Sequence, residues 1–190
     1  CSCRSHASLT SKTSDDEAVE DDRIAARVGL ADQAKKLYED QFQDSQIADN
    51  VKSFPSFDRG QLKLGKILGK GNFGTVYEIR KIHTSNADSE EAHFLAEHCL
   101  REKTGEARYA MKVLSEENLV EEGNYVRGIT DLAIEARILS SIEHPNIIKM
   151  RGIACASPFD AGYGEGNFFI VMDRLCETLD GRRSEEHTSE

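Results

Sequence analysis

The sequence predicts an α+β fold, and three observations support this prediction. Five segments have the length and the β-branched, aromatic or aliphatic content of strands: residues 61–68, 75–79, 108–114, a segment beginning at 147, and 168–172. Residues 129–142 place apolar side chains at helical spacing. The first two strand segments flank a short glycine-rich stretch, so we expect them to form a hairpin.

Length and composition limit the function classes. The 190 residues can form one domain with a buried core. The net charge of −10 argues against nucleic acid or an anionic membrane as the main partner, and no apolar run reaches the roughly 18 residues of a membrane span. The five cysteines are odd in number and form no C-x-x-C pair, which favours a reducing compartment, the cytoplasm or the nucleus.

Residues 1–55 are predicted to be an acidic leader, partly helical or disordered. Residues 1–14 lack structural signals, and residues 15–49 predict one or two helices with a break near Gly29. Such a helix either packs on the following domain or serves as a regulatory or docking helix. Pro55 marks the boundary with that domain. The apolar stripe consists of Ile24, Val28, Ala31, Ala34, Leu37, Tyr38 and Phe42.

A long connection, residues 81–108, follows the hairpin. Residues 89–100 within it predict a short helix with acidic residues in its first turn, where the helix dipole favours them. His93, His98 and Cys99 raise the alternative of a metal site. The two histidines are five residues apart and do not share a helix face, so we favour an inserted surface helix.

The glycine-rich stretch, residues 68–77, has the spacing G-x-G-x-x-G-x-V, with glycines at Gly69, Gly71 and Gly74 and a valine at Val76. Glycine permits a positive φ and a close approach of the backbone to a ligand, and loop N–H groups are natural partners for phosphate oxygens. A dinucleotide-binding fold would require a helix after the glycines. A strand follows here, which disfavours that alternative.

Two charged residues are candidates for a pair. Lys112 shares a strand face with Ala110, because side chains alternate with period two. Glu135 lies between two apolar helix stripes, and burying its carboxylate is costly without a cation. Lys112 is the cation that we expect to pair with it. The stripes are formed by Leu132, Ala136 and Leu139 and by Ile138 and Ile142.

Taken in order, these motifs resemble the amino-terminal lobe of eukaryotic-type protein kinases, over residues 58–176. The glycine loop, the Ala-x-Lys of Lys112, the helix glutamate, the H-P-N-I-I-K run at 144–149 and a hinge at 173–175 appear in the family's sequence. The resemblance implies a five-stranded antiparallel sheet with one helix, and catalytic roles for Lys112 and Glu135. It places Met172 at the gatekeeper position. The implied nucleotide contacts are Leu68, Gly69, Lys70, Gly71, Asn72, Phe73, Gly74, Val76, Ala110, Lys112, Met172, Asp173 and Leu175.

The resemblance also implies an activity, transfer of the γ-phosphoryl group of ATP to a Ser or Thr of a protein substrate with Mg²⁺. The H-R-D-x-x-x-x-N and D-F-G motifs do not occur in this sequence. We therefore expect the Mg²⁺ ligands in a carboxyl-terminal lobe outside it, and expect this stretch alone to be inactive. The alternative is a pseudokinase, a nucleotide-binding or scaffolding module.

Residues 177–190 are expected to be the interrupted start of that second lobe. The last eight, Arg183 to Glu190, are wholly polar and resemble the translation of a common sequencing-library adapter. We expect the native protein to diverge from this sequence at or just before Arg183.

Overall fold

The computed structural model describes residues 14–43, 52–72, 74–115, 122–160 and 168–175, with side chains from residue 28 onward. The predictions for residues 1–13, for Phe73 and for the tail from 176, including the divergence at Arg183, lie outside the described residues. Most of the predicted sheet, both of its helices and the predicted pair lie within them.

A six-stranded sheet forms the centre of the molecule, in the order β1-β5-β6-β4-β3-β2. Neighbouring strands are antiparallel except β1 and β5, which are parallel. The five predicted strands are therefore present, with one short edge strand added. The bounds are β1 (Ser56–Phe57), β2 (Leu62–Lys70), β3 (Gly74–Ile82), β4 (Tyr109–Leu114), β5 (Met150–Ala154) and β6 (Phe169–Asp173).

The missed strand β1 is held by one aromatic side chain. Phe57 is fully buried in the core, and its carbonyl accepts a hydrogen bond from the Cys155 N–H at 3.0 Å. Two residues are too few to show a strand period, so this pairing depends on the tertiary position of β5. The predicted start of β5 at Ile147 is wrong. Residues 144–147 form a turn instead, in which the Ile147 N–H donates to the His144 carbonyl, and the strand begins at Met150.

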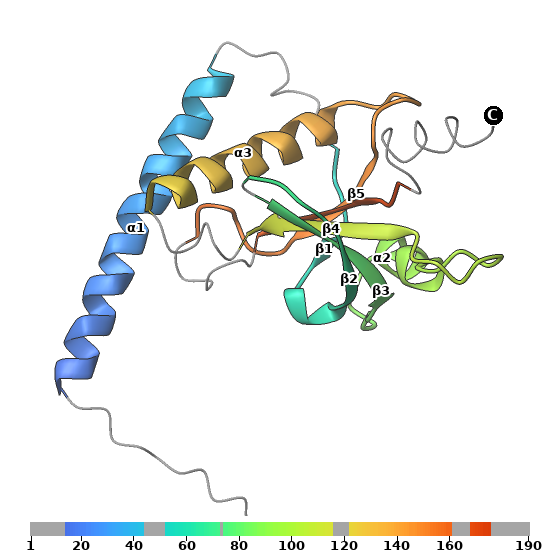
Figure 1. Ribbon diagram of the computed structural model, residues 1–190, viewed down its shortest axis with the longest axis horizontal. Coiled ribbons are helices and arrows are strands. Elements are labelled where there is room, and N and C mark those ends of the chain that lie inside the picture. Colours follow the sequence, from blue (N-terminus) through green and yellow to red (C-terminus); the bar gives the residue numbers. More distant parts are fainter. Residues whose placement is uncertain (1–13, 44–51, 73, 116–121, 161–167, 176–190) are drawn as a thin grey trace, which may run out of the picture.

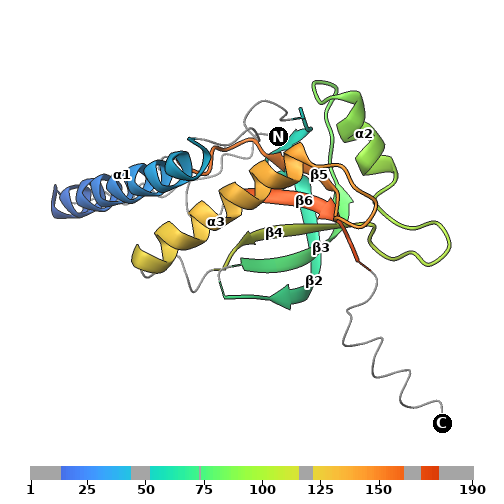
Figure 2. The same cartoon turned by 90° about the horizontal axis from the view of Figure 1, so that it is seen from above.

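Helix α3 (Glu122–Ser141) lies across one face of the sheet (Figure 2). It begins seven residues before the predicted start, and Ile142 falls just past its end. Small and apolar side chains on one side of the helix are buried: Val126, Ile129, Leu132, Ala133 and Ala136. Glu135 comes from this helix, so the packing of α3 on the sheet fixes where its carboxylate lies.

Helix α1 (Ser14–Phe42) is continuous through Gly29, so the predicted break is absent. The helix packs against α3 (Figure 1), as one of the two interpretations of the leader proposes. Ala31 and Ala34 are buried there, and Thr130 Oγ1 donates to the Ala34 carbonyl at 3.3 Å. Val28 and Leu37, at 45% and 44% exposed, lie outside the contact. The contact is therefore narrower than the apolar stripe predicts, and a regulatory role for α1 stays a prediction.

Helix α2 (Glu90–Glu97) is the predicted inserted helix, at the end of the sheet away from α1 (Figure 2). Ser89 caps it by accepting a hydrogen bond from the Ala92 N–H at 3.2 Å. His98 stacks on Phe94, and the Cys99 thiol donates to the Ile79 carbonyl at 3.3 Å. Across the described ranges no three His, Cys, Asp or Glu side chains form a group that could hold a metal ion. In the same part of the chain, no helix is both long and apolar enough to cross a membrane.

Two thiols should differ in reactivity. Burial raises the pKa of Cys99 to about 11, mainly through desolvation, whereas Cys155 is exposed. We expect iodoacetamide at pH 8 to alkylate Cys155 well before Cys99, because the thiolate is the reactive form and needs access. Since the folded pKa of Cys99 is raised, this thiol also lowers the free energy of unfolding as pH rises from about 9 to about 11. Peptide mass spectrometry measures the order; equal labelling of both cysteines in the native chain would contradict it.

Candidate functional site

A cavity of about 510 Å³ lies between the β2–β3 hairpin, β4 and α3. The hairpin carries the glycine loop over one side of the cavity, and α3 closes the opposite side. Its lining residues are Gly69, Lys70, Gly71, Asn72, Gly74, Val76, Lys112, Val113, Leu114, Gly128, Asp131, Leu132 and Glu135.

The predicted ion pair between Lys112 Nζ and Glu135 Oε2 is present at this cavity. Lys112 is held by the β3–β4 ladder, where it lies opposite Val76, and Glu135 is held by the buried side of α3. The side chains are 30% and 34% exposed, so neither charge is fully removed from water. An ammonium group has three donors, which leaves Lys112 able to contact a second anion in the cavity while it holds Glu135.

The loop glycines differ from expectation in their backbone. Among the described residues only Gly105 has a positive φ, at 66°, so Gly69, Gly71 and Gly74 do not adopt the left-handed conformation. Space is the requirement at Gly74: a Cβ there would lie 3.2 Å from Lys112 Cε and 3.3 Å from the Val113 carbonyl oxygen. The loop tip is closed by a hydrogen bond of 2.8 Å from the Gly71 N–H to the Gly74 carbonyl.

The remaining predicted residues lie outside the lining of this cavity, Leu68 in β2, Ala110 in β4, and the others in or just after β6. Ala110 and Met172 are cross-strand partners, and both are buried. Asp173 receives two hydrogen bonds from Arg151, at 2.8 and 2.9 Å, and this contact raises the pKa of the Arg151 guanidinium. Leu175 is 68% exposed. The predicted residues that line the cavity are Gly69, Lys70, Gly71, Asn72, Gly74, Val76, Lys112 and Glu135; those that do not are Leu68, Ala110, Met172, Asp173 and Leu175.

Two features of the site were missed in the sequence. Asp131 lines the cavity one helical turn before Glu135, and the i, i+4 spacing placed it on the same face. Arg151 pairs with Asp173 from the neighbouring strand β5, and no sequence signal pointed to it. The arrangement places one oriented cation, two carboxylates and a glycine-loop backbone around one cavity.

Comparison with known proteins agrees with this arrangement. The chain is 32% identical over 108 residues to the "Tyrosine-protein kinase transforming protein ros" of UR2 avian sarcoma virus. It is 29% identical over 143 residues to the rat "Proto-oncogene tyrosine-protein kinase ROS" and 29% identical over 130 residues to the mouse "Ribosomal protein S6 kinase alpha-2". These matches cover 54%, 75% and 68% of this chain but only 20%, 5% and 14% of the relatives. No protein-family model matches the chain.

The relatives and the fold together identify a protein-kinase-like domain, and the part of it described by the structure is an α+β amino-terminal lobe. The predicted family is confirmed at this level. Two of these relatives carry tyrosine in their names, and the third is named for ribosomal protein S6.

Proposed function

We propose that this kinase-like lobe binds ATP and belongs to an enzyme that transfers its γ-phosphoryl group to a hydroxyl group of a protein substrate. One observation carries the proposal: Lys112, oriented by Glu135, faces the same cavity as the glycine loop. A fixed cation beside a phosphate-covering loop is what phosphoryl transfer requires, because catalysis there depends mainly on positioning and charge stabilisation.

The residues around the cavity fit the phosphates of a nucleotide. Lys112 would orient the α- and β-phosphates, and Gly69, Gly71 and Gly74 would cover them. The Gly71 N–H is already bound to the Gly74 carbonyl, so the ammonium group of Lys112 is the donor that we expect to contact the phosphates; Lys70 lines the same cavity. Glu135 would act through Lys112 by holding its ammonium group in place. Adenine would lie toward the hinge, near Val76 of β3, Ala110 of β4 and the backbone of residues 173–175.

The described residues do not fit a magnesium site. In those ranges no group of three or more His, Cys, Asp or Glu side chains could hold a metal ion, and of the two carboxylates at the cavity Glu135 is already paired with Lys112. The family uses Asp and Asn residues of its second lobe for this purpose. No step through the metal follows from the present site.

For the acceptor we propose Ser or Thr, as the sequence resemblance implies, with Tyr as the second candidate because of the tyrosine kinase relatives. The full-length protein, incubated with γ-labelled ATP and Ser-, Thr- and Tyr-containing peptides, separates these possibilities after phosphoamino-acid analysis. ATP binding without transfer to any peptide would instead support the pseudokinase alternative. The free thiols at Cys99 and Cys155 support a reducing compartment, which we propose to be the cytoplasm or nucleus.

Gly74 offers a test of the cavity geometry. We expect Gly74→Ala to weaken ATP binding by on the order of tenfold, about 1.4 kcal/mol, because the new Cβ presses on Lys112 and Val113. Gly60→Ala is the matched control, since a Cβ at Gly60 meets nothing within 4 Å. Calorimetric titration of the full-length variants measures both affinities. Equal loss in the two variants would show that the close approach at Gly74 has no bearing on the nucleotide.

A further inference from the structure

Arg174, in the hinge after β6, is bound to the inserted segment through both of its backbone polar groups. Its N–H donates to the Arg108 carbonyl at 2.8 Å. Its carbonyl accepts a hydrogen bond from Arg101 Nη2 at 3.0 Å. The hinge backbone is therefore fixed from one side by residues 101–108, the last part of the long β3–β4 connection.

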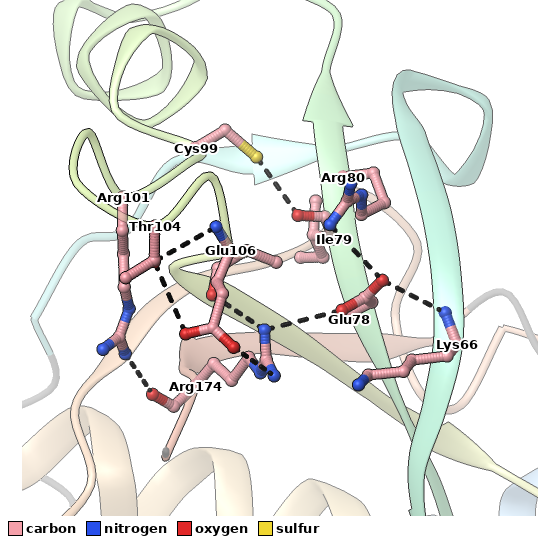
Figure 3. Close-up of polar contacts among 10 residues, drawn as sticks. Lys66, Glu78, Ile79, Arg80, Cys99, Arg101, Thr104, Glu106 and Arg174 are labelled. Atoms are coloured by element: carbon pink, nitrogen blue, oxygen red, sulfur yellow. Dashed lines mark hydrogen bonds and ion pairs between the residues drawn. The ribbon is translucent and has the colours of Figure 1, made fainter.

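The side chain of Arg174 turns back from the hinge into a polar cluster, as Figure 3 shows. Its Nη1 lies 3.5 Å from Glu78 Oε2 and donates to the Ala107 carbonyl at 3.4 Å. Its Nη2 lies 3.6 Å from Glu106 Oε1. Arg174 and Glu78 are only 10% and 8% exposed. One side chain thus connects the hinge with β3 and with the insertion.

Stability alone is a weak reason for this cluster. Burying two charges costs desolvation energy that their attraction often only offsets. Arg174 Nε is in addition buried without a hydrogen-bond partner within the described residues, which increases that cost. A buried ion pair that contributes little net stability can still select one geometry, and the geometry that it selects here is that of the hinge.

The part of the insertion that contacts Arg174 is a turn held by its own hydrogen bonds. Arg101 N–H donates to the Glu106 carbonyl and Gly105 N–H donates to the Arg101 carbonyl, both at 2.8 Å, so the segment closes on itself as a tight turn. Gly105 has φ 66°, which favours glycine. Thr104 Oγ1 accepts from the Glu106 N–H at 3.3 Å. These bonds hold the backbone next to Glu106, Ala107 and Arg108, whose groups contact Arg174.

We propose that Arg174 is a positioning residue for the nucleotide. The insertion acts through Arg174 to hold the hinge backbone in the position where it contacts adenine. This inference rests on the proposed function, since the hinge matters for catalysis only if a purine binds there. It gives the 81–108 connection a role in substrate affinity, exerted through the network of Arg174, Glu78 and Glu106.

The kinetic test compares two arginines that contact the same carboxylate. Arg80 Nη1 lies 3.7 Å from Glu78 Oε1, but Arg80 is exposed and has no contact with the hinge among those that the structure describes. In the full-length protein we expect Arg174→Ala to raise the KM for ATP about tenfold while kcat at saturating ATP changes less than about twofold. Arg174→Lys should recover part of the loss, because it keeps the charge but not the forked donors. Arg80→Ala should leave KM unchanged.

A second measurement does not depend on the nucleotide. Hydrogen exchange of residues 168–175 in the 190-residue chain should accelerate in Arg174→Ala and in Gly105→Val, and stay unchanged in Arg80→Ala. Unaltered exchange and an unaltered KM in Arg174→Ala would overturn the inference. So would a rise in KM that comes with a matching fall in kcat and in the free energy of unfolding. If the wild-type protein binds no ATP, the proposed function fails, and exchange alone then decides whether Arg174 holds the hinge.

Discussion

Replacing Lys112 with Met in the full-length protein should reduce phosphoryl transfer by about 10²–10³-fold or more, the loss typical of removing one preorganised group that stabilises transition-state charge. The fold should persist, because Met has a similar length and the lysine is partly exposed at the cavity. Glu135→Gln should have a smaller effect in the same direction, since the glutamine can still contact Lys112 without its charge. Initial rates with γ-labelled ATP and a generic acceptor give the comparison.

Lys81→Met is the control for this substitution. Lys81 is an exposed lysine on the adjacent strand β3 that pairs with Lys63 of β2, and it does not line the cavity. Its replacement removes the same charge from the same sheet and should leave the rate unaltered. A Lys112→Met protein that phosphorylates at the wild-type rate would show that the catalytic assignment of Lys112 is wrong.

Introducing a carboxylate at the α1–α3 contact should cause a large loss in the free energy of unfolding. Ala34 has no exposed surface, and its carbonyl accepts the Thr130 hydroxyl. Ala34→Asp would bury an unpaired charge, at a cost of about 3–5 kcal/mol unless α1 leaves α3. We therefore expect either that loss in the free energy of unfolding or release of α1. Urea unfolding and limited proteolysis between α1 and β1 report the two outcomes.

Gln33→Asp is the matched control, because it introduces the same side chain one position away on the exposed side of α1. It should unfold at the wild-type urea concentration and leave α1 protected. If both variants unfold at the same denaturant concentration with α1 equally protected, the packing of Ala34 on α3 would contribute nothing to stability.

The parts of the fold that depend on local signals could be predicted from the sequence. The β2–β3 hairpin, helix α2 with its acidic first turn, and the pairing of Lys112 with Glu135 all follow from spacing, residue type and the order of motifs. The functional meaning of the pair depends on the family resemblance as well, because an isolated lysine on a strand carries little information.

The parts that depend on tertiary context could not. Strand β1 is two residues long and exists through the burial of Phe57. Helix α1 runs through Gly29 although a helical glycine costs about 1 kcal/mol relative to Ala. That cost alone does not end a helix of 29 residues. Arg174 and Glu78 are far apart in sequence, and only the folded sheet brings them within 3.5 Å. The hinge network was missed for this reason.

Covalent labelling tests the central claim, that Lys112 lies beside the phosphates of bound ATP. An acyl phosphate of ATP carries its reactive carbonyl next to the terminal phosphate and acylates a lysine held within reach. With the full-length protein, peptide mass spectrometry should find the acyl group on Lys112, and excess ATP should prevent the labelling. Labelling that ATP does not suppress, or that falls on exposed lysines such as Lys63 and Lys81 in preference to Lys112, would contradict the account.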